Sequence, residues 1–373
     1  GKNLIELTKI IEDNKKKIEM HIFTNKVLFK FDNTLFQTRV LSGNFPDVNR
    51  LIPSSFELEI TAGLNEFYNV IDRASLLTNE KDKNIWETYE LNHPDTYLDR
   101  RSITDVKSDD IPTVDGIIGG PPCQSWSAGG SKRGIEDPRG QLFFDFIRIL
   151  QEKQPKFFLA ENVSGMLAKR HEESLTNIME LLGAAGYDIF FSTLNASDYG
   201  VAQDRKRVIF IGFRKDLKVD YSFPPPVEKK KCLKDIIYDL SDSALPALNK
   251  SKPNVDLSVP NHEYMTGGFS SMYMSRNRVR SWDEPSFTIQ ASGRQSPIHP
   301  SAPKMIKIEQ DIHEFVPGHE YRRMSVRESA RIQGFPDDFI FKYKDLNDGY
   351  KMIGNAVNVE FAKVLADSIK DAL

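Results

Sequence analysis

One cysteine of the chain lies in a tract whose composition suits a presented nucleophile. The tract Gly119 to Ser125 (GGPPCQS) holds Cys123 on a turn directly after an apolar run, Gly116 to Ile118. The neighbouring glycines and prolines make such a turn stiff, so the thiol is expected at the tip of a loop and not inside a core. A lone cysteine in a turn is more often inert than reactive, and the tract alone leaves both interpretations open.

A carboxyl group is expected to share the cleft of this cysteine. Glu161 follows the apolar run Phe157 to Ala160, and ligand sites of open α/β sheets gather where strands end. A glutamate at the end of a strand is by itself more often an ordinary surface residue. Because Cys123 and Glu161 both follow strands of one predicted sheet, we expect them to face one cleft.

Two arginines stand just before a third predicted strand, in the tract Gln203 to Arg207 (QDRKR). Arg205 and Arg207 either belong to a solvated turn or enter the cleft, where they would lower the pKa of the Cys123 thiol and bind an anionic group. A thiolate, a carboxyl group and arginines suit nucleophilic addition to an electron-poor ring. Acyl or amide chemistry could use the same groups, but no histidine stands beside them, as a cysteine hydrolase would need.

Arginines recur in an irregular stretch, in the tracts MSRNRVR and SGRQ. The cationic cluster that these tracts predict contains Arg276, Arg278, Arg280 and Arg294. Surface arginines usually serve solubility, whereas alternation with small and aromatic residues favours groove reading, in which arginine donates two bonds to a guanine edge. Nearby Met272 either enters DNA beside the target base or belongs to a local core.

The segment from about residue 79 to 220 alternates strand-like apolar runs with helical stretches. This alternation predicts βαβ units and a mostly parallel sheet, and therefore an α/β fold. In chain order the predicted elements are Gly116 to Ile118, Gln141 to Gln151, Phe157 to Ala160, Leu175 to Ala185, Ile189 to Leu194 and Val208 to Phe213.

The flanking segments have other patterns. Upstream we expect an α+β mixture with helices at Leu4 to Asn14 and Leu64 to Leu77, and strands at His21 to Phe31, Thr34 to Leu41 and Phe56 to Thr61. Downstream, the proline- and lysine-rich run Pro224 to Lys231 predicts a hinge. An irregular zone follows to about residue 316, and helices are expected again at Ser325 to Gln333 and Val359 to Leu373.

Bulk composition limits the classes of function. The net charge of −3 over 373 residues means that any nucleic-acid contact must come from a local basic face. Two cysteines form no disulfide framework and fit a reducing, cytoplasmic setting. No apolar run is long enough to span a bilayer, so no membrane role is expected. The seven histidines show no metal-ligand spacing, so we predict no metal.

Taken together, these tracts resemble the motifs of the bacterial DNA cytosine-5 methyltransferases from about residue 79 onward. GGPPCQS resembles the nucleophile motif, Glu161 to Val163 the ENV motif and Gln203 to Arg207 the QxRxR motif. Arg331 to Pro336 (RIQGFP) and Gly354 to Val357 (GNAV) resemble the later motifs that return to the catalytic domain. The resemblance implies a Rossmann-like catalytic fold with a small, irregular DNA-recognition domain.

The resemblance also implies a mechanism. A cytosine of double-stranded DNA is flipped into the cleft, Cys123 adds to C6, Glu161 holds N3, and Arg205 and Arg207 steady the base and the cysteine. C5 then takes a methyl group from S-adenosyl-L-methionine. The arginine tracts resemble those of the subgroup that methylates the internal cytosine of GGCC, which assigns guanine contacts to Arg278 and Arg294, with Arg276 beside them in the recognition of DNA. A cognate restriction endonuclease is linked only functionally.

The cofactor side departs from the family pattern. On the resemblance, Glu80 binds the ribose and Trp86, Pro121 and Asn355 complete the cofactor pocket. We do not identify the glycine-rich FxGxGG turn that holds the methionine end of the cofactor. Ser102 stands where an aspartate is expected, and Asn358 stands where the family has proline.

The first part of the chain is similar to something else. The stretches FDNTLFQTRVLSGNFPD, RLIPSSFELEIT and IDRASLL resemble the sliding clamp (β subunit) of bacterial DNA polymerase III. The predicted organisation is a clamp-like fragment over 1–78, a catalytic domain over 79–223, a target-recognition domain over 224–325 and a return to the catalytic domain over 326–373.

Three functions follow as hypotheses. The first is a DNA cytosine-5 methyltransferase of a restriction-modification system. The second is a catalytically impaired chimera that still binds GGCC, because the glycine-rich cofactor motif is absent. The third, a clamp-related replication accessory, has least support because a clamp ring needs repeated domains that this chain lacks.

Overall fold

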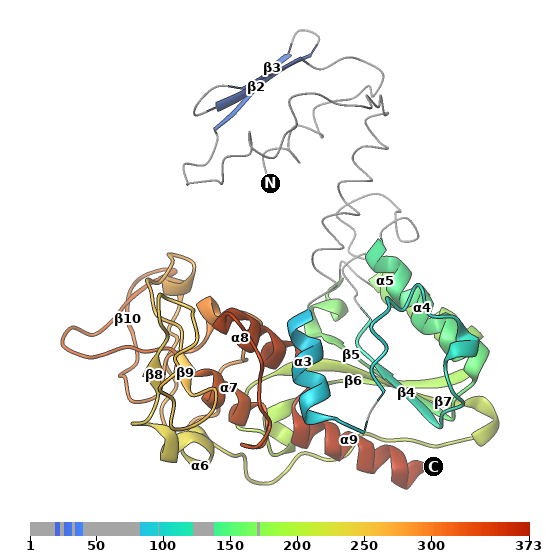
Figure 1. Cartoon of the computed structure of the whole chain (residues 1–373). Coiled ribbons are helices and arrows are strands. Elements are labelled where there is room, and N and C mark those ends of the chain that lie inside the picture. The colour runs from blue at the N-terminus through green and yellow to red at the C-terminus, as the bar shows by residue number, and fades with distance from the viewer. Residues whose placement is uncertain are drawn as a thin grey trace. The chain divides into compact units, whose positions relative to one another are not determined.

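The computed structural model describes residues 19–22, 26–31, 34–39, 83–95, 97–121, 138–169 and 172–373. The chain divides into two compact units, residues 1–81 and 82–373 (Figure 1). In the first unit, β1 (Glu19–Ile22), β2 (Lys26–Phe31) and β3 (Thr34–Arg39) form an antiparallel sheet in chain order. The strand expected over His21 to Phe31 therefore spans parts of two strands. The strand expected over Thr34 to Leu41 is present as β3, which covers Thr34 to Arg39. The two helices and the strand Phe56 to Thr61 expected before residue 79 lie outside the described residues.

A four-stranded mixed sheet organises the second unit. Its strands are β4 (Gly116–Gly119), β5 (Phe157–Val163), β6 (Tyr187–Asn195) and β7 (Lys206–Arg214), in the order β4-β5-β7-β6. β4 and β5 are parallel, whereas β7 is antiparallel to both of its neighbours. Three strands thus run in one direction and β7 in the other, so only one neighbouring pair is parallel, where the sequence predicted a mostly parallel sheet. The start of β7 consequently lies beside the end of β5, with Arg207 opposite Val163.

Helices cover both faces of this sheet (Figure 1). Because side chains alternate along a strand, Val208 and Phe210 pack with α4 (Pro138–Lys153) and α5 (Glu172–Ala184). Ile209 and Ile211 point the other way and pack with Phe361 and Leu365 of α9 (Val359–Ala372). The result is a three-layer α/β/α unit, in agreement with the Rossmann-like class expected from the sequence.

The elements between β7 and α9 belong to a part of the chain with little regular structure, which contains a second core. They are α6 (Leu233–Ile237), β8 (Leu245–Pro246), β9 (Glu263–Tyr264), β10 (Ile306–Glu309), β11 (Ile312–Glu314), α7 (Val326–Ile332) and α8 (Leu346–Asn355). Leu233 of α6, Ile332 of α7 and Tyr350 of α8 belong to one buried cluster. Of the C-terminal helices, α7 and α8 therefore share a core with the irregular segment, and α9 packs on the sheet.

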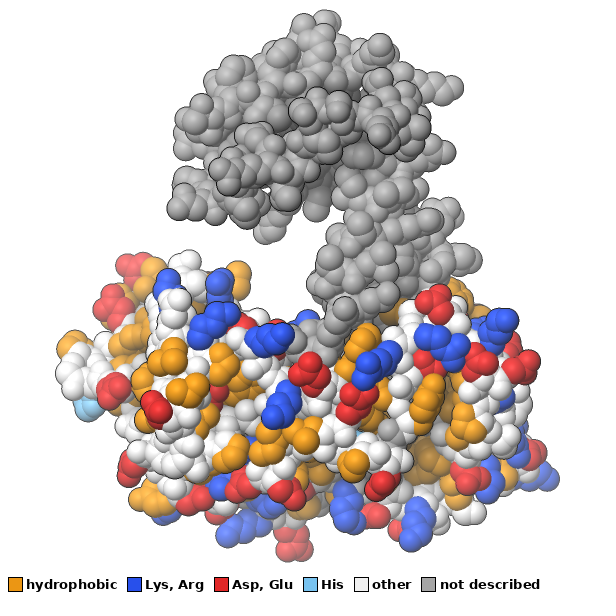
Figure 2. Space-filling model, viewed as in Figure 1, with side chains coloured by type: hydrophobic (Ala, Val, Ile, Leu, Met, Phe, Trp, Pro, Cys, Tyr) orange, Lys and Arg blue, Asp and Glu red, His pale blue; other side chains and the backbone are white. Residues whose placement is uncertain are grey.

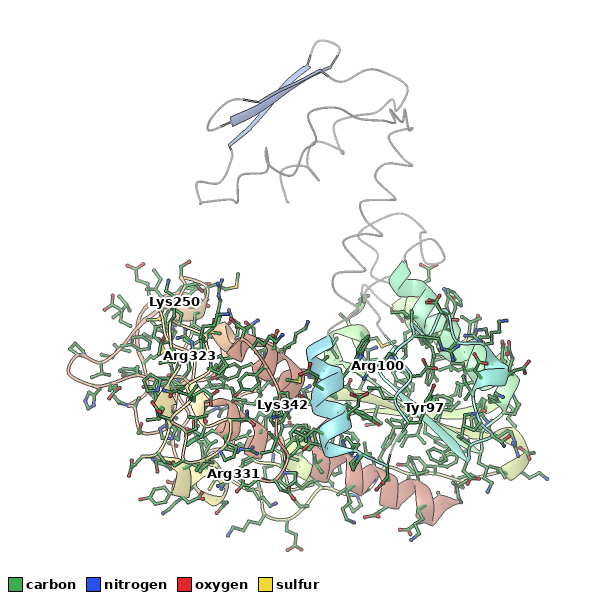
Figure 3. The ribbon with its side chains drawn as sticks, viewed as in Figure 1. Tyr97, Arg100, Lys250, Arg323, Arg331 and Lys342 are labelled. Carbon is green, nitrogen blue, oxygen red and sulfur yellow. The ribbon has the colours of Figure 1, made fainter. Side chains whose placement is uncertain are left out.

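A further helix, α3 (Lys83–Asn92), attaches to the extended segment that follows α7. Asn92 accepts a hydrogen bond from the Ile340 amide at 2.9 Å and donates one to the Ile340 carbonyl at 2.9 Å. One turn earlier, Thr88 Oγ1 accepts from the Lys342 amide at 2.8 Å. Figure 3 labels Lys342 next to α3. Through these hydrogen bonds the side chains of Asn92 and Thr88 pair with the backbone at residues 340 and 342. They hold in place the helix that contains Trp86.

Candidate functional site

A carboxylate and a guanidinium meet where β5 and β7 lie side by side. Glu161 stands opposite Ile209 in the antiparallel register, and Arg207 is two residues away on the same face of β7. The Arg207 Nε and Glu161 Oε1 atoms are 2.6 Å apart, and the side chains are 16% and 18% exposed. The ion pair is thus largely shielded from solvent but still reachable, which suits a group that meets a ligand.

The end of β4 approaches the same carboxylate. A side chain at Gly120 would place its Cβ 3.8 Å from Glu161 Oε2, so the backbone runs directly beside this oxygen. Asn162 Nδ2 donates a hydrogen bond to the Pro121 carbonyl at 2.9 Å. The two residues after this tether lead to Cys123, which lies outside the described residues, as does the loop from Gln124 to Asp137.

Arg205 has a different environment from Arg207. Its side chain is buried, and its guanidinium donates to the backbone carbonyls of Gly354 at 2.9 Å, Ala356 at 3.2 Å and Ile289 at 3.2 Å. Burial, and then the neighbouring charge of Arg207, lower the pKa of Arg205 to about 10, so it stays charged at neutral pH. Arg205 therefore holds the segment that contains GNAV against the recognition segment.

Arg205 and Arg207 border a pocket of about 770 Å³. Its lining joins four parts of the chain: Val163 and Ser164 at the end of β5, Asn195 with Asp204 to Arg207, Thr288 to Ala291, and Gly354 with Asn355. Lys206, Gln290 and Asn355 are exposed within this lining. A pocket bordered by the cationic side chains of Arg205 and Arg207 and by several amide and hydroxyl groups can accept a flat polar ring.

A buried glutamine that the sequence analysis did not single out connects these segments. Gln333 Oε1 accepts a hydrogen bond from Gln203 Nε2 at 3.0 Å and a second from Asn358 Nδ2. Gln333 Nε2 donates to the Ile353 carbonyl at 2.6 Å. Gln333 is fully buried. The sequence did contain a signal for this role, because Gln333 stands between the apolar positions of RIQGFP and a buried amide needs hydrogen-bond partners.

The residues expected to hold the cofactor are only partly described. Trp86 is half-buried, and the Arg100 guanidinium lies 5.3 Å from its ring centroid (Figure 3). Pro121 is buried, Asn355 is exposed in the pocket, and Glu80 lies outside the described residues. An aromatic ring and an exposed amide suit the adenine and the polar parts of S-adenosyl-L-methionine. These residues therefore fit part of that cofactor.

The recognition arginines divide into two kinds. Arg276 and Arg294 are exposed, whereas Arg278 is buried. Arg278 Nε donates to the Tyr273 carbonyl at 2.7 Å, and its guanidinium lies 4.5 Å from the Tyr273 ring centroid. Arg278 thus braces the local backbone, while Met272 beside it is 72% exposed.

The visible surface carries charges of both signs, with lysines and arginines interspersed among aspartates and glutamates (Figure 2). Among the residues that the structure describes, no group of histidine, cysteine, aspartate and glutamate side chains could hold a metal ion. None of the helices in the described part of the chain is long and apolar enough to cross a membrane.

Comparison with known families gives two matches that do not overlap. Residues 59–371 match the family of C-5 cytosine-specific DNA methylases. Residues 1–47 match the central domain of the DNA polymerase III beta subunit. Residues 59–78, which the sequence analysis assigned to the clamp-like fragment, thus fall inside the methylase match.

Individual relatives point the same way. The chain is 57% identical over 304 residues to the type II methyltransferase M.FnuDI of Fusobacterium nucleatum, covering 80% of this chain and 88% of the relative. It is 57% identical over 302 residues to M.NgoPII of Neisseria gonorrhoeae, covering 79% and 88%. The crystal structure of a prophage-encoded DNA modification methyltransferase of E. coli superposes with a TM-score of 0.57 at 25% identity, covering 78% of this chain and 90% of that one.

Proposed function

This chain belongs to the C-5 cytosine-specific DNA methylases and is a DNA cytosine-5 methyltransferase of the type II restriction-modification kind, and we propose that it methylates the internal cytosine of a GGCC site. The observation that carries the proposal is the Glu161–Arg207 ion pair beside the Asn162–Pro121 tether. It places an oriented carboxyl group next to the backbone that leads to Cys123.

Chain connectivity supports the role of Cys123. Cys123 is the second residue after Pro121, whose carbonyl accepts a hydrogen bond from Asn162 Nδ2. The thiolate forms a bond from sulfur to C6 of the everted cytosine, and the electrons of the C5–C6 double bond move to C5. Glu161 supplies a proton or a hydrogen bond to N3 and so stabilises the negative charge that develops on the ring, while Arg207 keeps the carboxyl group oriented.

The remaining steps restore the aromatic ring. S-adenosyl-L-methionine supplies the methyl group when it is bound, with Glu80, Trp86, Pro121 and Asn355 as the proposed binding residues. A base then removes the C5 proton, the C5–C6 double bond re-forms and the sulfur of Cys123 leaves. Arg205 acts here through the backbone of Gly354 and Ala356, which it holds at the edge of the pocket.

The target sequence rests on the recognition tract. Arg276 and Arg294 are exposed cations, as guanine-reading arginines must be before DNA arrives. Arg278 donates through Nε and Nη2 to backbone carbonyls, so it contributes to DNA contact through its remaining donors and by shaping the tract. We assign insertion beside the flipped base to Met272, which is exposed and unbranched.

Plasmid protection tests the proposal. Expression of the chain is expected to protect plasmid DNA from a GGCC-cutting nuclease, and Cys123→Ala is expected to abolish protection while DNA binding persists. The matched control is Cys232→Ala, which removes the other thiol at the start of α6 and should leave protection intact. Protection that survives Cys123→Ala would remove the nucleophile assignment.

A second candidate function is a catalytically impaired GGCC-binding protein, favoured by the missing glycine-rich turn. It predicts no protection by the native chain but retained preference for a GGCC duplex. Calorimetric titration with S-adenosyl-L-methionine separates the two candidates, since micromolar binding contradicts the impaired one. Insertion of a complete glycine-rich turn should restore protection if the impaired function is correct.

A further inference from the structure

Arg280 belongs to the cationic tract but is held inside the protein. Its Nη2 lies 3.0 Å from Asp204 Oδ2, and its Nη1 lies 3.3 Å from Glu284 Oε1, with the side chain 26% exposed. Its guanidinium also lies 4.3 Å from the ring centroid of Phe287. Two acidic partners and an aromatic face therefore occupy the group that would otherwise be free for a phosphate or a base.

Asp204 has a partner for each of its polar groups. Its amide donates to the Ser286 carbonyl at 2.8 Å, and its carbonyl accepts from Thr288 Oγ1 at 2.6 Å. Its Oδ1 accepts from Asn195 Nδ2 at 3.2 Å, and Oδ2 faces Arg280. One residue thus joins the end of β6, the segment 286–288 and the arginine tract.

Asp204 and Arg280 are close in the chain to residues of the pocket and of the recognition tract. Arg205 follows directly and holds the GNAV backbone, and Arg207, three residues after Asp204, holds Glu161. On the other side, Arg280 is two residues after Arg278, whose carbonyl accepts from the Ile298 amide at 3.0 Å. A shift of the Asp204–Arg280 pair would move the recognition tract relative to the Glu161–Arg207 pair.

We propose that Asp204 and Arg280 are positioning residues that hold the sequence-reading tract 276–280 in fixed register with the pair that receives the cytosine. The inference rests on the proposed function, because it concerns how recognition of the site and placement of the base are coupled. Arg280 contacts no DNA in this scheme, although it stands among the arginines that do. Its charge instead forms ion pairs within the protein, and these align the hydrogen-bond donors of the neighbouring arginines.

Asp204→Asn and Arg280→Gln test this inference. Asp204→Asn removes the charge but keeps an oxygen for Asn195 and leaves both backbone bonds in place. Fluorescence anisotropy measures affinity for a GGCC duplex and for duplexes with one changed base, at several salt concentrations. We expect each variant to reduce discrimination between these duplexes about tenfold, with an unchanged salt slope. The double variant should lose no more than either single variant.

The opposite outcome has a distinct signature. If Arg280 bound a phosphate, Arg280→Gln would weaken binding to every duplex equally and reduce the salt slope by about 1, while Asp204→Asn would have no effect. If the positioning role is correct, Arg280→Lys, which keeps the charge, should recover part of the discrimination between duplexes that Arg280→Gln loses. The control pair is Lys363–Asp367 on the exposed side of α9, where Asp367→Asn should change nothing.

A measurement without DNA separates this inference from the proposed target. Hydrogen exchange of the amides in residues 276–288 should become faster in both Asp204→Asn and Arg280→Gln than in the native protein. Unchanged exchange in both variants overturns the positioning role. A native protein that shows no preference for GGCC, together with faster exchange in the variants, rejects the GGCC target and retains the junction.

Discussion

Arg205 and Arg207 are separated by one residue, yet they do different work. Arg207 lies inside β7, where the antiparallel register brings it to Glu161. Arg205 precedes the strand and turns into the interior, where three backbone carbonyls surround it. Residue type predicted two cations at one edge of the sheet. Only the register and the packing decide which of them pairs with Glu161 and which one braces the backbone.

A buried histidine makes stability depend on pH. Burial lowers the pKa of His299 to about 4, although Glu328 Oε1 lies 3.4 Å from its Nε2. The ordinary pKa of histidine is about 6.5, so the unfolded chain takes up this proton first as pH falls. The contribution of His299 to the free energy of unfolding is therefore fully present above about pH 6.5, and the free energy of unfolding decreases by about 3 kcal/mol as the pH drops to about 4.

Urea unfolding between pH 4 and pH 8 measures this dependence. Burial raises the pKa of Glu328, but the hydrogen bond and charge of Arg322 outweigh burial and lower it. The stability that Glu328 contributes is therefore also lost as the pH falls. The control is His299→Gln, which cannot take up a proton and should flatten the curve between pH 6.5 and pH 4. A native protein whose unfolding free energy is constant over that interval contradicts the assignment.

At the scale of elements, the start of α9 explains one departure from the family pattern. Asn358 has φ −60°, which proline adopts without strain, and its carbonyl rather than its N–H makes the helix bond to Ala362. Its side chain donates to Gln333 Oε1, which also accepts from Gln203. At this position asparagine lacks the rigid backbone of proline but makes one buried hydrogen bond instead.

Asn358→Pro should consequently change the free energy of unfolding by less than about 1 kcal/mol, because the lost bond and the stiffer unfolded chain nearly cancel. Gln333→Leu is the contrasting variant. It removes the partners of Gln203 and Asn358 and should cost about 3 kcal/mol. Thermal and urea denaturation measure both values. A cost for Asn358→Pro as large as that for Gln333→Leu would show that the backbone there does not accept proline.

The sequence analysis predicted those helices and strands whose own hydrophobic periodicity determines their structure. Periodicity located β5, β6, β7, α4 and α5 to within a few residues. It could not give the direction of β7, because alternation is the same in parallel and antiparallel strands. It also gave no signal for α8, whose segment LNDGYKMIGN contains two glycines and forms a helix because Leu346, Tyr350 and Ile353 are buried at helical spacing.

Side-chain partners were harder to predict than elements. The tether from Asn162 to Pro121 agrees with the expectation that the ENV and GGPPCQS tracts meet at one edge. The exposure of Arg276 and the burial of Arg278 could not be predicted, since both residues lie in one irregular tract. Irregular backbone has no periodicity from which a direction follows.

At the scale of the whole molecule, two parts of the chain match different family models. The clamp match ends at residue 47 and the methylase match begins at residue 59. The described buried clusters of the second unit draw all their buried members from Phe143 to Ile369. β4 is an edge strand among the described strands, paired with β5 alone.

Deletion of residues 1–47 should therefore leave the methyltransferase unit intact. We expect its thermal midpoint to change by less than about 2 °C and its duplex discrimination and plasmid protection to stay at the level of the full chain. Scanning calorimetry and the protection assay measure these properties. Deletion of residues 1–81 is the comparison, because it also removes the segment 59–81 and Glu80, and should reduce S-adenosyl-L-methionine binding if that segment contributes to the pocket. A loss of cooperative melting after the shorter deletion would mean that the clamp-like segment supports the catalytic unit.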